Sequence, residues 1–216
     1  MKDLVKRSFT SIPLLFVLYL SLLNQLMFFF LLIIISFFVL NEMFSLIKNI
    51  FIKDKSKILT FYLITIIYLL FFFTQLYLFV NYNYVNKLYF IFFLAICIAT
   101  DTGGYVFGNL FKGKKLTKIS PNKTYSGLIG SYFLSSLVFS FFYYQFKFSY
   151  SLLILTLFIS SISQIGDLFI SYLKRKAKVK NTGDLLPGHG GILDRIDGII
   201  FGIPFGINLL FVFKWK

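Results

Sequence analysis

The fold class is decided by residues 8–41, SFTSIPLLFVLYLSLLNQLMFFFLLIIISFFVLN, a run of 34 residues that contains no charged side chain. An α-helix rises about 1.5 Å per residue, so this run would form a helix of about 50 Å. That is too long for one crossing of a hydrocarbon core of roughly 30 Å. Asn24 and Gln25 form a polar break in the middle of the run. The sequence therefore predicts two helices here, at 9–23 and at 26–50.

The composition of the whole chain agrees with this membrane pattern. Of its 216 residues, 58% are hydrophobic, 21% are aromatic and 14% are charged. A soluble domain is about 45–50% apolar and about 25% charged, and a disordered chain needs low hydrophobicity. Both classes are excluded, and we expect an all-α, polytopic integral membrane protein.

Five further apolar runs follow the first pair of predicted helices. They cover 58–86, 88–100 with a continuation towards Leu110, 124–146, 148–173 and 198–213. The segment 174–197 is polar and glycine-rich, so we expect a loop there. The result is about seven transmembrane helices in a single membrane domain over 1–216. It consists of N-terminal helices over 1–100, a core over 101–198 and a last helix over 199–216.

The charge distribution predicts the orientation of these helices. The 22 Lys and Arg outnumber the 8 Asp and Glu, which gives a net charge of +14. With the N-terminus in the cytoplasm, the inside segments hold 18 of the 22 cations and the outside segments hold 4. Basic residues gather on the cytoplasmic side of membrane proteins. We therefore expect a cytoplasmic N-terminus, and a re-entrant hairpin at the first pair would change only the number of spans.

Three acidic residues lie within or at the end of apolar runs. Asp101 and Asp167 each lie at the cytoplasmic end of such a run, beside glycines. Carboxylates at such depth are costly and usually face a polar cavity, and glycines allow a ligand to approach closely. We expect both to face a polar, cytoplasm-facing cavity, with a helix-end cap as the alternative. For Glu42, the only Glu, a structural hydrogen bond or an interfacial position explains the residue as well as a function does.

The densest group of polar residues is Leu185-Leu-Pro-Gly-His-Gly-Gly-Ile-Leu-Asp-Arg-Ile-Asp-Gly198. Its proline and glycines predict a tight turn with accessible backbone N–H groups, which is suited to phosphate oxygens when it leads into a helix. Asp194 and Asp197 would share one helix face and repel each other unless a cation lies between them. Carboxylate oxygens suit Mg²⁺. The alternative is an exposed polar loop.

Two basic loops fall on the predicted cytoplasmic side, over 112–123 and 174–180. Such clusters contact anionic lipids and fix topology, and beside an Asp pair and a glycine turn they also suit a polyphosphate or a phospholipid headgroup. Neither loop contains a Walker pattern. The aromatic residues lie within the spans, so we expect no nucleic acid as a partner.

With these motifs the chain resembles the phosphatidate cytidylyltransferase (CDP-diacylglycerol synthase) family. The family signature contains Ser, two residues, Lys-Arg, a short spacer, Lys-Asp, a Pro-Gly-His-Gly-Gly turn and Asp-Arg-x-Asp. The matching residues here are Ser171-Tyr-Leu-Lys174-Arg175, Lys180-Asn181, Pro187-Gly188-His189-Gly190-Gly191 and Asp194-Arg195-Ile196-Asp197. Residues 101–105 and 119–127 are similar to two further family segments. The departures are Asn181, Ser126 and Asn122, where the family usually has Asp, Glu and Lys.

The resemblance implies the reaction of CTP with phosphatidate to give CDP-diacylglycerol and pyrophosphate, at the cytoplasmic face of a bacterial inner membrane. It implies Mg²⁺, with a second cation left open, held by Asp167, Asp194 and Asp197. It gives catalytic roles, mainly the neutralisation of phosphate charge, to Lys174, Arg175, His189 and Arg195, where His189 either donates to phosphate or braces the turn. Substrate contacts fall to Lys123, Gly188, Gly190, Gly191 and Asp101. The partners are then CTP, phosphatidate and membrane lipids, with a homodimer left open.

Other functions remain as alternatives. A CTP-dependent polyprenol or lipid kinase would use the same residues, a transporter would place its charges along a path that reaches both sides, and an inactive homologue would explain Asn181 and Ser126. A CDP-alcohol phosphatidyltransferase needs an Asp-Gly-x-x-Ala-Arg stretch, whereas Asp197-Gly198 is followed here by Ile-Ile-Phe-Gly.

Overall fold

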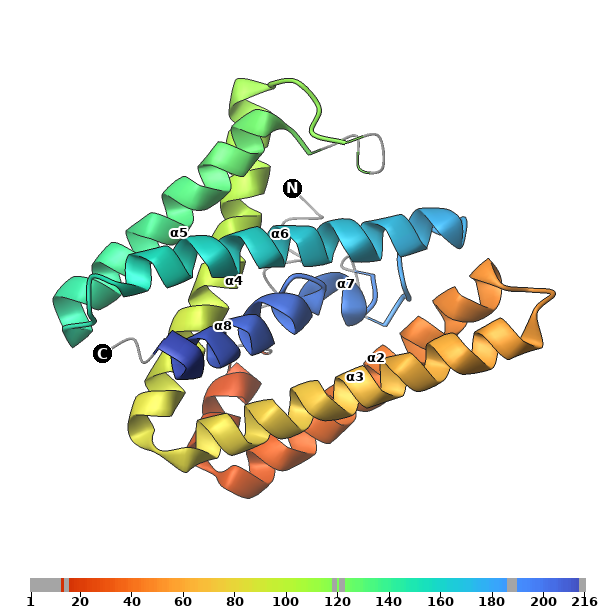
Figure 1. The fold of residues 1–216 in the computed structure, drawn as a ribbon, viewed down its shortest axis with the longest axis horizontal. Coiled ribbons are helices and arrows are strands. Elements are labelled where there is room, and N and C mark those ends of the chain that lie inside the picture. The colour runs from red at the N-terminus through yellow and green to blue at the C-terminus, as the bar shows by residue number, and fades with distance from the viewer. Residues whose placement is uncertain (1–12, 14–15, 118–119, 121–122, 186–189, 214–216) are drawn as a thin grey trace. The chain divides into compact units, whose positions relative to one another are not determined.

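The computed structural model describes residues 13, 16–117, 120, 123–185 and 190–213, and it is helical over most of this length (Figure 1). No β-strand is present among these residues. The elements, in chain order, are α2 (Gln25–Ile50), α3 (Lys55–Tyr82), α4 (Tyr84–Phe111), α5 (Tyr125–Phe146), α6 (Leu152–Lys176), α7 (Leu193–Ile196) and α8 (Ile199–Phe213).

The predicted break at Asn24 is confirmed. Residues 16–23 are helical, Asn24 is not, and α2 begins at Gln25. The Asn24 backbone is extended, and its side-chain oxygen accepts the backbone N–H of Leu26 at 2.9 Å. Asn is a preferred N-cap because it satisfies one of the N–H groups that a helix start leaves without a partner. The part of the predicted 9–23 helix that precedes residue 16 lies, apart from Pro13, outside the described residues.

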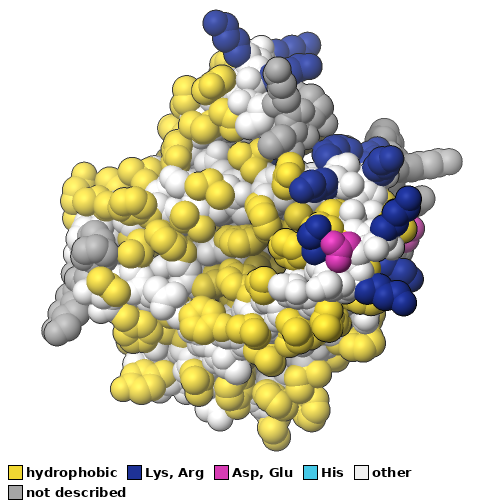
Figure 2. Space-filling view, turned by 45° about the vertical axis from the view of Figure 1, so that its right-hand side comes forward, with side chains coloured by type: hydrophobic (Ala, Val, Ile, Leu, Met, Phe, Trp, Pro, Cys, Tyr) yellow, Lys and Arg dark blue, Asp and Glu magenta, His cyan; other side chains and the backbone are white. Residues whose placement is uncertain are grey.

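Among the described residues, five helices, α2 to α6, are long and apolar enough to cross a membrane, with lengths of 22 to 28 residues. Helix α8 has 15 residues, about 22 Å at 1.5 Å per residue, and is therefore shorter than a full span. Figure 2 shows apolar side chains over most of the visible surface, while Lys and Arg gather in a few places. The prediction of an all-α, polytopic membrane protein is confirmed.

The prediction of a loop over 174–197 is wrong at both ends of this range, because helices begin or end inside it. Helix α6 continues through Lys176, and residues 193–196 form the short helix α7. The physical reason lies in the last turn of α6, which carries Lys174, Arg175 and Lys176. Cations at a helix C-terminus interact favourably with the helix dipole, so these polar residues extend the helix and do not end it.

The chain packs as two compact units. Unit 1 comprises Met1–Asn83 and Leu173–Ile196, and unit 2 comprises Tyr84–Tyr172 and Asp197–Lys216. Each unit is therefore built from two separate stretches of sequence. The borders of these units differ from those of the predicted regions 1–100, 101–198 and 199–216. This division does not test whether the chain forms a single membrane domain with a core over 101–198, which stays a prediction.

In unit 1, α2 and α3 pack against each other as a helical hairpin. The rings of Phe44 and Tyr62 lie 4.8 Å apart, and those of Phe51 and Phe61 stack at 4.9 Å. Asp54 caps α3 by accepting the backbone N–H of Lys57. Hydrogen bonds from the Lys57 side chain and backbone lower the pKa of this exposed carboxyl below its usual value. The unit also contains α7, which contacts α2.

In unit 2, α4 and α5 approach so closely that only glycine fits at the contact. A Cβ on Gly103 would collide with the Gly130 carbonyl group, and a Cβ on Gly130 would collide with the Phe107 side chain. Hydroxyl groups continue the contact: Ser131 Oγ donates to the Thr100 carbonyl at 2.6 Å. Small residues and interhelical hydroxyl bonds are typical of helix packing in membranes.

Candidate functional site

Unit 2 contains a polar cavity of about 280 Å³, built by α4, α5, α6 and the loop that precedes α5. Two predicted site residues with carboxylates, Asp101 from α4 and Asp167 from α6, line this cavity together with the predicted Lys123. The other polar side chains that line it are Thr100, Tyr105, Ser120, Thr124, Ser131 and Gln164. Asp101 and Asp167 therefore line one cavity with other polar side chains, and Lys123 joins them; that this cavity faces the cytoplasm and binds substrate stays a prediction.

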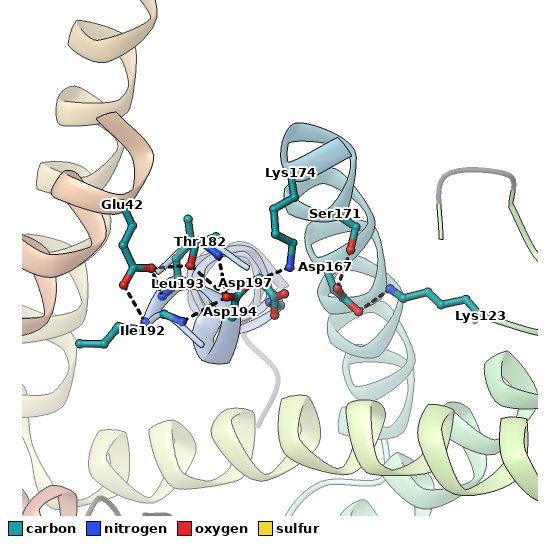
Figure 3. A network of polar contacts seen from close by, with 12 residues as sticks. Glu42, Lys123, Asp167, Ser171, Lys174, Thr182, Ile192, Leu193, Asp194 and Asp197 are labelled. Carbon is teal, nitrogen blue, oxygen red and sulfur yellow. Dashed lines mark hydrogen bonds and ion pairs between the residues drawn. The ribbon is translucent and has the colours of Figure 1, made fainter. Parts of the chain in front are cut away.

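Lys123 forms an ion pair with Asp167 across this cavity (Figure 3). Each side chain is 25% exposed, so the pair is only partly open to solvent. The hydroxyl of Ser171, one turn further along α6, donates to the other carboxylate oxygen of Asp167 at 3.3 Å. The cation and its counter-charge are thus held at the cavity wall, where an incoming anion would meet the lysine.

Backbone hydrogen bonds in the loop bring Lys123 to this position. Lys115 and Thr124 form an isolated antiparallel bridge, and the N–H of Leu116 donates to the Lys123 carbonyl at 2.8 Å. Ser126, where the related family usually has Glu, accepts the N–H of Gly113 at 3.3 Å. The serine therefore has a structural role at the base of the basic loop.

Unit 1 contains a second lysine–aspartate pair, between Lys174 of α6 and Asp194 of α7 (Figure 3). The Lys174 Nζ donates to Asp194 Oδ1 at 2.6 Å, and the two side chains are only 14% and 9% exposed. Asp194 Oδ2 accepts the N–H groups of Thr182 and Gly191 at 2.8 and 3.1 Å. Hydrogen bonds in which the donor, the acceptor or both carry a charge are shorter and stronger than those between neutral groups.

Glu42 is the residue that the sequence reasoning left undecided and the structure places in the same network. From α2, its Oε1 accepts the N–H of Ile192 and its Oε2 accepts the N–H of Leu193, both at 2.9 Å. The hydroxyl of Thr182, a second residue not singled out from the sequence, donates to Glu42 Oε2 at 2.6 Å. The available signal was a lone Glu within an apolar helix, which is costly unless it has partners. The sequence does not show that these partners lie 140 to 151 residues away.

The glycines of the predicted turn make room for these carboxylates. Gly190 has a φ of +83°, in the left-handed region that favours glycine, and a Cβ there would lie 2.8 Å from Asp194 Oδ2. A Cβ on Gly191 would collide with the Thr182 hydroxyl and the Glu42 carboxylate. That these glycines contact phosphate stays a prediction. Gly188 and His189 lie outside the described residues.

The remaining predicted residues are placed as follows. Arg175 is exposed in the last turn of α6, and Arg195 lies in α7. Asp197 belongs to unit 2, is 7% exposed, and accepts the N–H of Gly198 through Oδ1 at 2.9 Å. The structure thus groups Asp101, Lys123 and Asp167 in unit 2. It groups Lys174, Gly190, Gly191 and Asp194 in unit 1.

The available donor atoms bear on whether the predicted metal ligands suit Mg²⁺. Within each unit, the described residues contain no group of three or more His, Cys, Asp or Glu side chains that could hold a metal ion. Both oxygens of Asp194 already have protein donors, and so do both oxygens of Asp167, from Lys123 and Ser171. In unit 2, carboxylate, amide and hydroxyl oxygens line one cavity, and such hard oxygen donors suit Mg²⁺. The set of Asp167, Asp194 and Asp197 stays a prediction.

These features define a helical, polytopic membrane protein that holds a lysine–aspartate pair within each of its units. A sequence profile of the Cytidylyltransferase family matches residues 7–213, and the chain belongs to this family. It is similar to proteins named phosphatidate cytidylyltransferase in several bacteria.

Three of these relatives show the extent of the similarity. Identity to the protein of Rickettsia typhi is 41% over 136 residues, 57% of this chain and 60% of the relative. The Bacillus subtilis protein is 43% identical over 130 residues, 58% of this chain and 48% of the relative. The protein of Staphylococcus aureus strain COL is 43% identical over 128 residues, 57% and 49% of the two chains. The matched stretch thus spans about half to two thirds of the curated relatives.

Proposed function

We propose that this chain catalyses the transfer of the cytidylyl group from CTP to phosphatidate, which yields CDP-diacylglycerol and pyrophosphate. The observation that carries the proposal is the family match over 7–213 together with about 40% identity to proteins named for this reaction. The lysine–aspartate pairs support it, because the reaction brings two anions together inside a membrane protein.

The chemistry explains why positioned charges matter here. An oxygen of the phosphatidate phosphate attacks the α-phosphorus of CTP, the bond to the bridging oxygen of the β-phosphate breaks, and pyrophosphate leaves. The attacking phosphate is already anionic, so no strong general base is required. Catalysis then rests on positioning and on stabilising negative charge, as in phosphoryl transfer generally.

Each proposed residue has a charge or a position suited to this task. Lys123 lies at the wall of the unit 2 cavity, whose 280 Å³ is close to the lower end, about 300 Å³, of small-molecule sites. A cavity of this volume therefore suits one part of a substrate. In unit 1, Lys174 neutralises phosphate charge, as do Arg175 and Arg195 by forked hydrogen bonds.

Mg²⁺ is the cofactor of this proposal. Asp167 and Asp197 of unit 2 would hold it, and Asp167 shares the cavity with the oxygen donors Asp101 and Gln164. When bound, the ion supplies positive charge for the phosphate oxygens of the nucleotide. The Asp194 carboxylate keeps Lys174 as its counter-charge.

The proposal also includes a location. The apolar helices and the bacterial relatives fit an integral protein of the inner membrane, and the distribution of 18 and 4 cations favours a cytoplasmic location of the N-terminus and the basic loops. CTP would then reach the site from the cytoplasm, while phosphatidate would keep its acyl chains in the bilayer.

The test uses the purified full chain in phospholipid vesicles with Mg²⁺ and CTP. Vesicles contain phosphatidate, a polyprenol, or neither, and products are separated by lipid chromatography. Formation of CDP-diacylglycerol only with CTP and phosphatidate would support the proposal. A phosphorylated polyprenol would instead identify a lipid kinase, and no product with any acceptor would identify an inactive homologue or a transporter.

A further inference from the structure

We propose that Glu42 is a positioning residue for the transfer reaction: from α2 it holds the described parts of the segment 182–194, residues 182–185 and 190–194, which in turn hold the Lys174–Asp194 pair. This inference rests on the proposed function and deepens it. Nothing in the family resemblance or in the names of the relatives assigns a role to Glu42.

A single carboxylate here receives donors from two separate parts of the segment. The Thr182 hydroxyl comes from its beginning, and the N–H groups of Ile192 and Leu193 come from its end. The two N–H groups lie at the start of α7, where no carbonyl of the helix can accept them. An ionised carboxylate accepts at both oxygens, whereas an amide accepts at only one. The charged Glu side chain therefore fits this place, and Gln does not.

Thr182 links Glu42 to the lysine–aspartate pair. Its hydroxyl oxygen lies 2.6 Å from Glu42 Oε2 and 3.1 Å from Asp194 Oδ2, and its N–H donates to Asp194 Oδ2 at 2.8 Å. The residue is 8% exposed, so water does not readily replace these contacts. A continuous set of hydrogen bonds thus runs from α2 through Thr182 to Asp194 and Lys174 (Figure 3).

The packing around Glu42 leaves Gly183 and Gly191 little room to move. A Cβ on Gly183 would lie 3.2 Å from Glu42 Oε1, and one on Gly191 would collide with the carboxylate. Since Gly191 also donates its N–H to Asp194, a shift at Glu42 moves a donor of Asp194 as well. A misplacement of about 1 Å at a reacting group lowers the rate on the order of 100-fold. The expected consequence is a defect in turnover.

The first experiment measures hydrogen–deuterium exchange of residues 190–194 in the membrane-inserted full chain. In Glu42→Gln, the amides of Ile192 and Leu193 lose at least one acceptor, so their exchange should accelerate at least about tenfold, and Glu42→Asp should lie between Gln and wild type. Asp54→Asn is the matched control, because it also removes a carboxylate from unit 1 but keeps a good N-cap on α3. Its exchange over 190–194 should equal that of wild type.

The second experiment measures turnover per inserted protein, with kcat and the KM for CTP determined separately. We expect Glu42→Gln to lower kcat at least about tenfold, with partial rescue by Glu42→Asp and wild-type kinetics for Asp54→Asn. Thr182→Val removes the linking hydroxyl at nearly constant size. The double variant with Glu42→Gln should be no slower than the slower single variant, because both act through one set of contacts.

The results of these experiments distinguish the positioning role of Glu42 from the proposed transfer activity. Unchanged exchange over 190–194 in Glu42→Gln overturns the inference, and so does accelerated exchange with wild-type kcat. A loss of inserted protein that fully accounts for the lower activity likewise overturns a positioning role. If wild type makes no CDP-diacylglycerol, the proposed function has failed and the kinetic role falls with it. The exchange data then still decide whether Glu42 holds the segment.

Discussion

Lys174 forms an ion pair with Asp194, and this pair is largely buried. Removal of one partner of a buried ion pair leaves an uncompensated charge, which destabilises a protein by about 3–5 kcal/mol. Because Asp194 retains the N–H groups of Thr182 and Gly191, we expect Lys174→Met to lower the free energy of unfolding by about 3 kcal/mol, the lower end of that range.

Thermal unfolding in detergent checks this prediction at the residue scale. Lys180→Met is the control, since Lys180 is exposed in the same basic cluster. A melting temperature of Lys174→Met equal to that of Lys180→Met would show that the pair contributes nothing to stability.

Asp197 offers a test of charge that spares the fold. Its Oδ1 accepts the N–H of Gly198, and an Asn side chain in its place can accept the same bond. Asp197→Asn therefore removes mainly the negative charge, and we expect CDP-diacylglycerol formation to fall at least about 100-fold. The exposed Asp184 provides the matched control Asp184→Asn. Full activity of Asp197→Asn, measured per inserted protein, would remove Asp197 from the metal and catalytic assignments.

Some residues of the candidate site could be predicted from the sequence, whereas their long-range contacts could not. Asp101 and Asp167 were predicted because charges are rare in apolar surroundings, and Lys123 because it belongs to a basic loop that resembles a family segment. The structure places all three around one cavity. The contacts of Glu42 with Thr182 and with α7 could not be predicted, because hydrogen bonds across 140 to 151 residues leave no local pattern. Contact of Gly190 and Gly191 with phosphate stays a prediction, and the sequence did not indicate that the Asp194 and Glu42 carboxylates lie beside them.

At the element scale, the contact between α4 and α5 predicts a difference between adjacent glycines. A Cβ on Gly103 collides with the rigid backbone of Gly130, while one on Gly104 lies 3.1 Å from the Ser131 hydroxyl and at an ordinary contact distance of 3.9 Å from the Gly127 carbonyl oxygen. Gly103→Ala should therefore destabilise the protein by about 2–3 kcal/mol through overpacking. Gly104→Ala should stay within about 1 kcal/mol of wild type, since alanine favours the helix.

The measurement compares the thermal unfolding of Gly103→Ala and Gly104→Ala under the same conditions. Equal stabilities would contradict the close approach of α4 and α5. The reverse order, with Gly104→Ala the less stable variant, would contradict it as well.

The helices themselves were predictable because charges and polar residues mark most of their ends. Asn24 separates the first two helices as expected, and α5 ends at Phe146 as predicted. The end of α6 was misjudged because basic residues were taken as a loop signal, although they stabilise a helix C-terminus. The short α7 depends on Glu42 for its N–H partners, so its own four residues did not indicate it.

At the scale of the whole molecule, the proposed orientation makes a prediction about accessibility. Cys97 is fully buried, so a cysteine introduced at a surface loop is the main reactive thiol. In intact cells, a membrane-impermeant maleimide should label Lys147→Cys, from the segment between α5 and α6, and should not label Lys114→Cys. Labelling of Lys114→Cys before permeabilisation, with Lys147→Cys protected, would invert the orientation.

The activity proposed for this chain is the transfer of a cytidylyl group onto a lipid phosphate. The most direct measurement compares CTP labelled at the α-phosphate with CTP labelled at the γ-phosphate, each incubated with the full chain, Mg²⁺ and vesicles that contain phosphatidate. Cytidylyl transfer predicts that the α-label enters the lipid fraction as CDP-diacylglycerol and that the γ-label leaves in pyrophosphate. A γ-label in the lipid fraction, or no label in it from either nucleotide, would contradict the account.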